Sequence, residues 1–279
     1  MLPIAFLSSL GRSVCLAQPP MDVVEHNRQA WNRESLAECD WSIPVEPETI
    51  ANARAGNWSV ILTPVKPVPR EWFPDPLTGV DILCLASGGG QQVPVLAAAG
   101  ATVTSLENSD EQLAKDRMVA DREDLELTTI QGGMTDLSCF ADASFDLIFH
   151  PASNLFVPDV NPVWRECHRV LRSGGALLSG FMNPAYYLFD HDEAEKRGIL
   201  EVKYPLPYSD LTSLTDDERE RMLRDRGTLE FGHRLDDLIG GQLTTGFIIV
   251  GFYEDYWTDS ATLLNVYSPT SMATRAIKA

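Results

Sequence analysis

A turn of small residues and an acid further along the chain have the types and spacing that nucleotide binding requires. The turn is Ser87-Gly88-Gly89-Gly90, and the acid is Glu107. Three glycines let the backbone bend sharply and approach a ligand that side chains would exclude. Where such a turn opens a helix, free N–H groups face the ligand, and an acid ending the next strand can accept both ribose hydroxyls. These residues therefore predict a nucleotide site.

The elements that must position these residues can be read from the surrounding sequence. Residues 80–86 are an apolar run rich in branched side chains, which predicts a strand buried on both faces. Residues 91–99 predict a helix, since Pro94 falls in its first turn and Gly100 can cap its end. Residues 101–106 predict a second buried strand that ends at Glu107. Strand, glycine turn, helix, strand and acid form one nucleotide-binding half-unit.

The type of nucleotide follows from the details of the turn. A dinucleotide fingerprint needs G-x-G-x-x-G and a P-loop needs a lysine, and the contiguous glycines followed by Gln91 and Gln92 fit neither. Asp81, the Ser87–Gly90 turn and Glu107 instead resemble the first motif of the class I S-adenosylmethionine (SAM)-dependent methyltransferases. More narrowly, LCLASGGGQQ looks like a subgroup of small, mostly uncharacterised bacterial methyltransferases.

Two later segments extend this resemblance. Gln131-Gly132-Gly133-Met134 corresponds to the loop that flanks adenine in that family, with Gly133 where the pattern commonly holds an aspartate. Adenine would then be held by backbone groups near Gly133 and Met134, or through water. The resemblance implies SAM as cofactor and the following cofactor-binding residues: Ala86, Ser87, Gly88, Gly89, Gly90, Glu107, Asn108, Gln112, Gly133, Met134 and His150.

His150 is the best-placed candidate for a catalytic base. It follows the strand predicted at residues 145–149, which resembles the fourth strand of the family, and lies beside the expected methyl group. A base is needed only when the nucleophile must lose a proton. The alternative is that His150 only shapes the cofactor pocket. Tyr186 and Tyr187 are the candidates for substrate contacts.

The whole pattern predicts an α/β fold, a Rossmann-like doubly wound sheet that is mostly parallel and ends in a C-terminal antiparallel hairpin. A capping box at Ser109–Gln112 opens one helix, and Asn161-Pro162 opens the next as N-cap and first residue. That helix stops at the Ser173-Gly174-Gly175 turn. The other predicted elements are strands at 127–131, 176–180, 247–253 and 272–277 and a helix at 235–243.

The predicted organisation has five parts. Residues 1–20 are a disordered extension or follow a start codon assigned too early, with a signal peptide as the alternative. The other parts are a lid at 21–75, a SAM-binding core at 76–180, a cap at 181–233 that carries the substrate contacts, and a final helix and hairpin at 234–279. The lid tryptophans Trp31, Trp41, Trp58 and Trp72 either wall the active site or pack the lid onto the core.

Charge and cysteine content restrict the partners. The formal net charge of −18 repels phosphate backbones and anionic membrane surfaces, so a small-molecule methyl acceptor is expected, not nucleic acid or a membrane. The five cysteines are odd in number and lack metal-ligand spacing, so we expect no metal site and reduced thiols in a cytoplasmic protein. The oligomeric state is left open.

Two other functions compete with a small-molecule methyltransferase. One is an NAD(P)-dependent oxidoreductase on a Rossmann sheet, which the missing G-x-G-x-x-G disfavours. The other is a non-catalytic SAM-binding protein, which the substitution at Gly133 keeps open.

Overall fold

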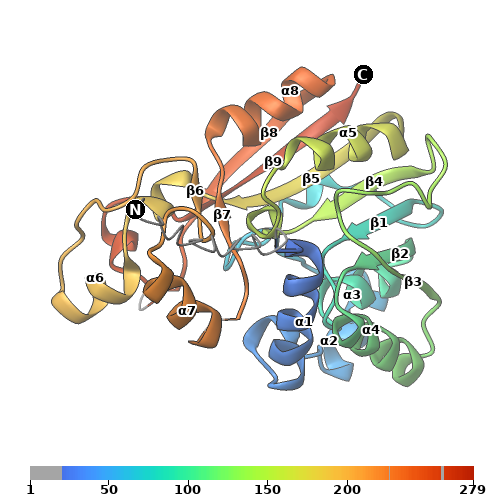
Figure 1. The fold of residues 1–279 in the computed structure, drawn as a ribbon. Helices are drawn as coiled ribbons and strands as arrows, with labels where there is room; N and C mark the ends of the chain where they lie inside the picture. The colour runs from blue at the N-terminus through green and yellow to red at the C-terminus, as the bar shows by residue number, and fades with distance from the viewer. Residues whose placement is uncertain (1–20, 226, 259–260) are drawn as a thin grey trace, which may run out of the picture.

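A seven-stranded sheet forms the centre of the computed structural model, which describes residues 21–225, 227–258 and 261–279 (Figure 1). The predicted extension at 1–20 lies outside these residues. The strand order is β3-β2-β1-β4-β5-β9-β8, with β1 to β5 parallel and β9 antiparallel to both its neighbours. The strands are β1 (Asp81–Leu85), β2 (Thr102–Glu107), β3 (Leu127–Gln131), β4 (Phe145–His150), β5 (Leu171–Met182), β8 (Phe247–Asp255) and β9 (Ser271–Lys278). The predicted fold class is confirmed.

The described residues also form eight α-helices, of which α6 and α7 lie in the cap. The nucleotide-binding half-unit has the predicted order, with α3 between β1 and β2, and Ser109 caps α4 as expected by accepting from the Gln112 N–H at 3.2 Å. The helix α2 was not predicted. The helices are α1 (Val23–Leu36), α2 (Pro47–Arg54), α3 (Gln92–Ala98), α4 (Asp110–Glu123), α5 (Asn161–Val170), α6 (His191–Arg197), α7 (Asp216–Asp225) and α8 (Gly241–Thr245).

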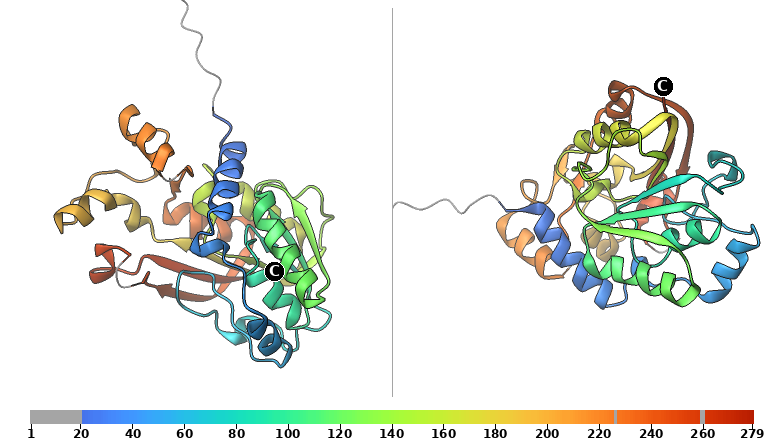
Figure 2. Two further views of the ribbon diagram at one scale, coloured as in Figure 1. Left: turned by 90° about the horizontal axis from the view of Figure 1, so that it is seen from below. Right: turned by 90° about the vertical axis from the view of Figure 1, so that its right-hand side faces the viewer.

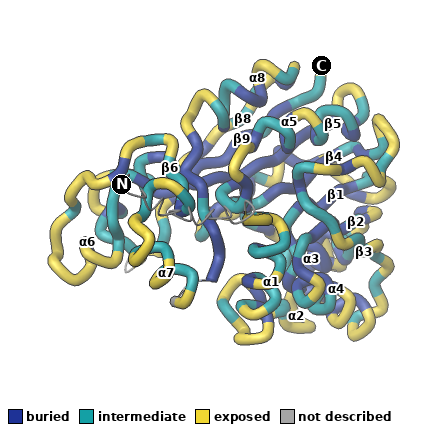
Figure 3. Tube along the Cα trace, in the orientation of Figure 1, coloured by how far each residue is buried: buried dark blue, intermediate teal, exposed yellow. Residues whose placement is uncertain are grey.

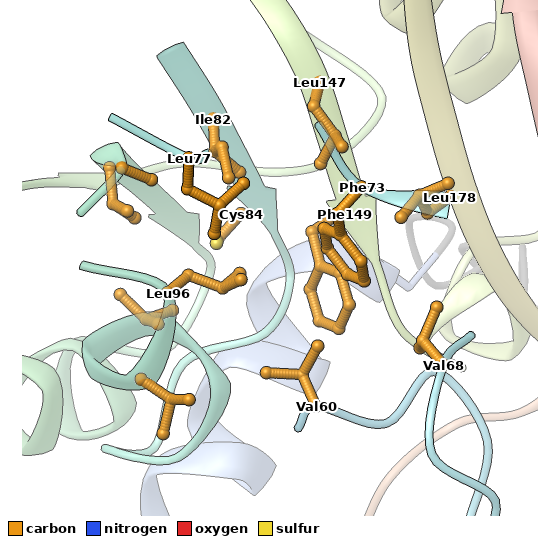
Figure 4. Close-up of a cluster of buried hydrophobic side chains, with 14 of the residues drawn as sticks. Val60, Val68, Phe73, Leu77, Ile82, Cys84, Leu96, Leu147, Phe149 and Leu178 are labelled. Carbon is orange, nitrogen blue, oxygen red and sulfur yellow. The ribbon is translucent and has the colours of Figure 1, made fainter. Parts of the chain in front are cut away.

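The alternation of side chains along β1 divides the core into two clusters. Ile82 and Cys84 point to the face that α2, α3 and α4 cover, where they join Leu147 and Phe149 of β4 (Figure 4). Leu83 and Leu85 point to the opposite face, which α5 covers. Both sets are fully buried, as a parallel sheet with helices on both faces requires. The central strands are therefore held from two sides.

The region from α5 to β5 differs from the prediction. Val160, not Asn161, is the N-cap of α5, and the helix ends at Val170 without a glycine turn. Residues 173–175 belong to β5, which starts at Leu171. The pairing with β4 shifts register between Phe145 and Leu147. At this point residues 172–175, which include both glycines, form a bulge in β5. The local glycine pattern resembles a turn; pairing with β4 is interrupted there and resumes at Ala176, opposite Leu147.

The end of the chain follows the predicted order with one change. The helix predicted at 235–243 is a π-helical turn, Asp236–Gly240, that continues directly into α8. The predicted hairpin is present as β8 and β9, whose antiparallel register runs from Phe247 opposite Lys278 to Asp255 opposite Ser271.

The cap at 181–233 projects from the sheet. Phe181 and Met182 still belong to β5, so the chain leaves the sheet after Met182. Beyond them lie α6, α7 and a two-stranded pair, β6 (Tyr208–Ser209) and β7 (Phe231–Gly232). Thr215 and Glu218 exchange hydrogen bonds at the start of α7, which form a capping box there. Much of α6 is exposed (Figure 3).

The lid helix α1 lies between the cap and the core, as both views of Figure 2 show. On the cap side, His26 Nε2 lies 2.8 Å from the carbonyl oxygen of Gly227. On the core side, Arg28 donates to the Asp110 carboxylate of α4 at 2.8 Å. The lid therefore joins two parts of the molecule that are far apart in sequence.

Two further observations concern the described residues taken together. Within the described ranges, no helix has the length and apolar character needed to pass through a membrane. Cys39, Cys84, Cys139 and Cys167 carry free thiols.

The close packing of Gly180 in β5 against the backbone of Leu62 can be tested. A methyl group at Gly180 would lie 2.0 Å from the carbonyl oxygen of Leu62, a backbone atom that cannot move away cheaply. We expect Gly180→Ala to lower the free energy of unfolding by about 3 kcal/mol or more in urea titrations. The matched control is Gly240→Ala, because Gly240 is helical and has no atom within 4 Å of an added Cβ. That variant should be neutral or gain up to about 1 kcal/mol, and equal losses in both would contradict the packing.

Candidate functional site

A cavity of about 580 Å³ opens at the carboxyl ends of the parallel strands. Its walls come from the loops after β1, β2, β3 and β4, from the lid and from the cap. Open α/β sheets place their ligands at this edge, and the volume lies within the range of small-molecule sites. The predicted site residues that line the cavity are Ala86, Ser87, Gly88, Glu107, Asn108, Gln112, Gly133, Met134, Tyr186 and Tyr187.

The glycine turn contributes only its first half to the cavity. Ala86, with φ of +50°, turns the chain at the end of β1, and Ser87 and Gly88 face the open space. Gly89 and Gly90 do not line the cavity. Both have positive φ, and the lid covers them, since an added Cβ would meet the carbonyl oxygen of Trp41 in one case and Pro44 in the other. A side chain is therefore excluded there by protein atoms.

Glu107 ends β2 at the wall of the cavity and is 9% exposed. Its Oε1 accepts from the backbone N–H of Ser109 at 3.0 Å, and its Oε2 accepts a long bond from the N–H of Gly88 at 3.4 Å. Burial raises the pKa of Glu107, and these backbone donors oppose that shift. The carboxylate is thus fixed in direction and retains capacity to accept further hydrogen bonds.

Two buried polar atoms beside Glu107 lack partners within the described part of the chain. They are Ser87 Oγ and Gln112 Oε1, and both residues line the cavity. Buried polar atoms are normally hydrogen-bonded, so an orphaned pair in a cavity indicates a polar ligand there. Ser87, Glu107 and Gln112 offer donors and acceptors that suit the hydroxyl and amino groups of SAM. The residues present therefore fit the expected cofactor.

The loop after β3 leaves space near Gly133. An added Cβ at Gly133 would meet only Val24 of the lid, at 3.6 Å. Steric crowding therefore does not explain the glycine. Asn108, on the neighbouring loop, donates through Nδ2 to the carbonyl oxygen of Val24 at 2.8 Å, which ties the lid to this side of the cavity.

His150 is placed differently from the other predicted residues. It ends β4 but is fully buried and does not line the cavity. Its Nδ1 lies 2.9 Å from the carbonyl oxygen of Leu85, and its Nε2 lies 2.8 Å from Asn154 Oδ1. Burial lowers the pKa of His150, against the effect of these two acceptors. The structure therefore does not bring His150 to where a reacting group could reach it.

Asp116 is a buried acid that the sequence reading did not single out. It lies on α4 with no exposed surface. Its Oδ1 accepts from the Gly90 N–H at 2.8 Å, and its Oδ2 accepts from Ser105 Oγ at 2.9 Å. Burial raises its pKa to about 7, while these donors lower it and Glu107 raises it further. The spacing along α4 could have indicated that Asp116 is buried. It follows Gln112 by four residues and lies on the helix face that also holds Val119.

A row of aromatic rings forms the cap side of the cavity. Trp41 contacts Trp257 with 6.3 Å between ring centroids, Trp257 contacts Tyr186 at 6.2 Å, and Tyr186 contacts Tyr187 at 5.4 Å. Trp31 lines the cavity as well. The row joins the lid, the cap and the segment after β8. Trp257 was not predicted, since nothing in its local sequence connects it to the cap.

Trp58 and Trp72 serve packing. Trp58 contacts Phe73 edge-on at 5.1 Å, and Trp72 contacts Tyr253 at 5.3 Å. Neither lines the cavity. The lid tryptophans thus divide between the two roles considered for them.

No group of three or more His, Cys, Asp or Glu side chains is arranged to hold a metal ion in the ranges that the structure covers.

Comparisons with known proteins give the family. A family model described as a methyltransferase domain matches residues 83–179. Over 256 residues the chain is 48% identical to the uncharacterised methyltransferase YbaJ of Bacillus subtilis, covering 92% of this chain and 98% of that protein. The chain belongs to the class I SAM-dependent methyltransferases. This methyltransferase uses SAM as its cofactor, and the oxidoreductase alternative is set aside.

Solved structures agree with the fold of this methyltransferase. A SAM-dependent methyltransferase from Mesorhizobium loti superposes with a TM-score of 0.58 at 20% identity, covering 75% of this chain and 94% of that one. A SAM-dependent methyltransferase from Methanosarcina mazei gives a TM-score of 0.54 at 19% identity, with coverage of 77% and 98%. At these identities the likeness concerns the fold.

The buried carboxyl of Asp116 predicts a dependence of stability on pH. The pKa is about 7 in the folded state and 3.8 for the free side chain, so between these pH values only the folded state keeps the proton. The contribution of Asp116 to the free energy of unfolding therefore falls as pH rises from 4 to 7 and is flat above, by at most about 4 kcal/mol. Asp116→Asn removes this effect, so urea titrations should show the variant gaining on the wild type between pH 5 and pH 8.

The control for this experiment is Asp121→Asn, which removes a carboxylate from the exposed side of the same helix. Its stability relative to the wild type should be the same at both pH values. A pH-independent difference for Asp116→Asn would mean that Asp116 is ionised throughout this range.

Proposed function

We propose that this methyltransferase transfers the methyl group of SAM to a small-molecule acceptor with a flat, apolar body. The observation that carries the proposal is the single cavity that joins the glycine turn and Glu107 to the aromatic row of Trp41, Trp257, Tyr186 and Tyr187. In this proposal SAM occupies the turn side and the acceptor lies against the rings. Offset and edge-on ring contacts favour flat apolar ligands.

The proposed roles at the turn side follow from the hydrogen-bonding capacity there. Glu107 accepts the ribose hydroxyls through its carboxylate, whose orientation Ser109 and Gly88 fix. Ser87 Oγ and Gln112 Oε1 gain the partners that they lack among the described residues. Because Gly133 leaves space beside Met134, adenine meets backbone groups in this loop and the side chain of Val24.

Chemistry at the junction of the two sides requires mainly positioning. SAM supplies a methyl group already activated by its sulfonium, which the lone pair of the acceptor takes as the carbon–sulfur bond breaks. The lid and cap hold the acceptor in line and exclude water. Aromatic faces such as Tyr186 favour a nearby cation.

His150 has a supporting role in this proposal. Its ring joins Leu85, at the end of β1, to Asn154, which also donates to the carbonyl oxygen of Gly180 at 3.0 Å. The histidine thus shapes the floor of the site by holding β1, β4 and β5 together at their carboxyl ends. His150 then does not act as a base, and an acceptor proton leaves to solvent or to another group at the site.

The setting follows from charge and thiols. A net charge of −18 disfavours a polynucleotide acceptor, which supports a small molecule. The free thiols at Cys39 and Cys139 support a reducing, cytoplasmic environment.

Glu107 provides the test of the cofactor side. Calorimetric titration should show that S-adenosylhomocysteine (SAH) binds the wild type and that Glu107→Gln weakens binding at least tenfold, because two charge-assisted hydrogen bonds are lost. The control is Glu126→Gln, which removes an exposed carboxylate away from the cavity and should leave the affinity unchanged. Unchanged affinity in Glu107→Gln would place the ribose elsewhere.

Tyr186 provides the test of the acceptor side. Truncating Tyr187 would disturb the cap, since its ring fills the space beside Gly232 and its hydroxyl donates to Glu230 at 3.1 Å. Tyr186→Ala is therefore the sharper variant. It should lower methyl transfer at least tenfold and leave SAH affinity within threefold, about 0.6 kcal/mol.

The assay for Tyr186→Ala begins with a screen of phenols, aromatic amines, thiols and matched aliphatic compounds with radiolabelled SAM. Tyr267→Ala removes a tyrosine that is 77% exposed and outside the cavity, and it should behave as wild type. If Tyr186→Ala lost SAH binding and kept its turnover at saturating SAM, the aromatic row would belong to the cofactor side.

A further inference from the structure

Two successive N–H groups of the glycine turn are held by α4. The Gly89 N–H donates to the carbonyl oxygen of Gln112 at 3.1 Å. The Gly90 N–H donates to Asp116 Oδ1 at 2.8 Å, one helical turn further along. The second half of the turn is therefore fastened to α4 and does not present its N–H groups to the cavity.

The same carboxylate also holds the strand that carries the ribose-binding candidate. Ser105 donates through Oγ to Asp116 Oδ2 at 2.9 Å. Ser105 lies two residues before Glu107 on β2, so both side chains point to the same side of the strand. One carboxyl group thus ties the glycine turn and the Glu107 strand to a single helix.

Gly90 is held from its other side as well. Its carbonyl oxygen accepts from the Val45 N–H of the lid segment at 2.9 Å. An added Cβ would meet Pro44 at 3.0 Å, the carbonyl oxygen of Lys115 at 3.1 Å and Val119 at 3.2 Å. The peptide at Gly90 is therefore fixed between α4 and the lid.

A buried acid at this position reduces stability, because burial disfavours its charged form. An apolar residue would avoid that cost and would leave the Gly90 N–H and Ser105 Oγ without an acceptor. The geometry explains why an acid occupies this position: a hydrogen-bond acceptor at Asp116 satisfies both the Gly90 N–H and the Ser105 hydroxyl.

We propose that Asp116 is a positioning residue for SAM, which sets the spacing between the Ser87–Gly88 edge of the turn and Glu107 by holding Gly90 and Ser105. It touches neither the cavity nor the reacting atoms. The inference rests on the proposed location of SAM at the turn side.

The test compares three variants by SAH calorimetry. Asp116→Ala removes the acceptor and should raise the Kd at least tenfold. Asp116→Asn keeps an acceptor for Gly90 and should stay within threefold of the wild type. Thr274→Val is the matched control, because it removes a buried hydrogen bond from Thr274 of β9 to Gln242 of α8, away from the cavity. It should lower the melting temperature without changing the Kd.

A second measurement needs no ligand. Hydrogen exchange at the Gly90 amide should be at least tenfold faster in Asp116→Ala than in the wild type, and unchanged in Thr274→Val. If Asp116→Ala does not fold, Asp116→Ser takes its place, because its shorter side chain cannot reach Gly90 and the same results are expected.

The outcomes separate this inference from the proposed cofactor site. If Glu107→Gln loses SAH binding while Asp116→Ala keeps it within threefold with slow Gly90 exchange, Asp116 has no positioning role. An equal loss of affinity in Thr274→Val and Asp116→Ala also overturns it, since the effect would then be general destabilisation. If neither Glu107 nor Asp116 affects SAH, but Gly90 exchange rises, the turn is positioned by Asp116 and SAM binds elsewhere; this overturns the role toward SAM.

Discussion

The hydrogen bond from the Gly90 N–H to Asp116 is the constraint on which the turn side of the cavity depends. Gly89 and Gly90 need positive φ values that other residues adopt at a cost, and α4 and the lid occupy the space that side chains would need. The glycines are thus required by the packing of the turn between two other segments. Only Ser87 and Gly88 remain to meet a ligand. The second half of the Ser87–Gly90 turn therefore packs the turn against α4 and the lid and does not contact a ligand.

The lid and the cap depend on each other through the cavity. Trp41 of the lid contacts Trp257, and Trp257 contacts Tyr186 of the cap, so the aromatic row exists only when three distant segments are assembled. Lys115 of α4 donates through Nζ to the carbonyl oxygens of Ser35 and Ser42, which holds the lid against the core. The same helix therefore supports the glycine turn and the segment that covers it.

The sequence predicted correctly the elements that depend on local sequence patterns. The half-unit from β1 to β2, the cap of α4 at Ser109 and the final hairpin depend on neighbours along the chain, and they match. The start of β5 did not, because its bulge depends on pairing with β4. The ring of His150 was expected at the correct edge of the sheet, but Leu85 and Asn154 turn it away from the cavity. Contacts between distant segments decided each of these differences.

The lid helix α1 is held against the cap and against the loop after β4 through the main-chain atoms of both. Asn27, buried on α1, donates through Nδ2 to the carbonyl oxygens of Phe156 and Leu229 and accepts the Leu229 N–H at 2.8 Å. These hydrogen bonds depend on the position of the backbone and not on which side chains the bonded residues carry. Side chains of the cap that face the cavity, such as Tyr186, can therefore be exchanged without removing these hydrogen bonds. The lining of the cavity and the attachment of the lid are therefore separable properties, so substitutions in the cap can alter the shape of the cavity while the lid stays attached.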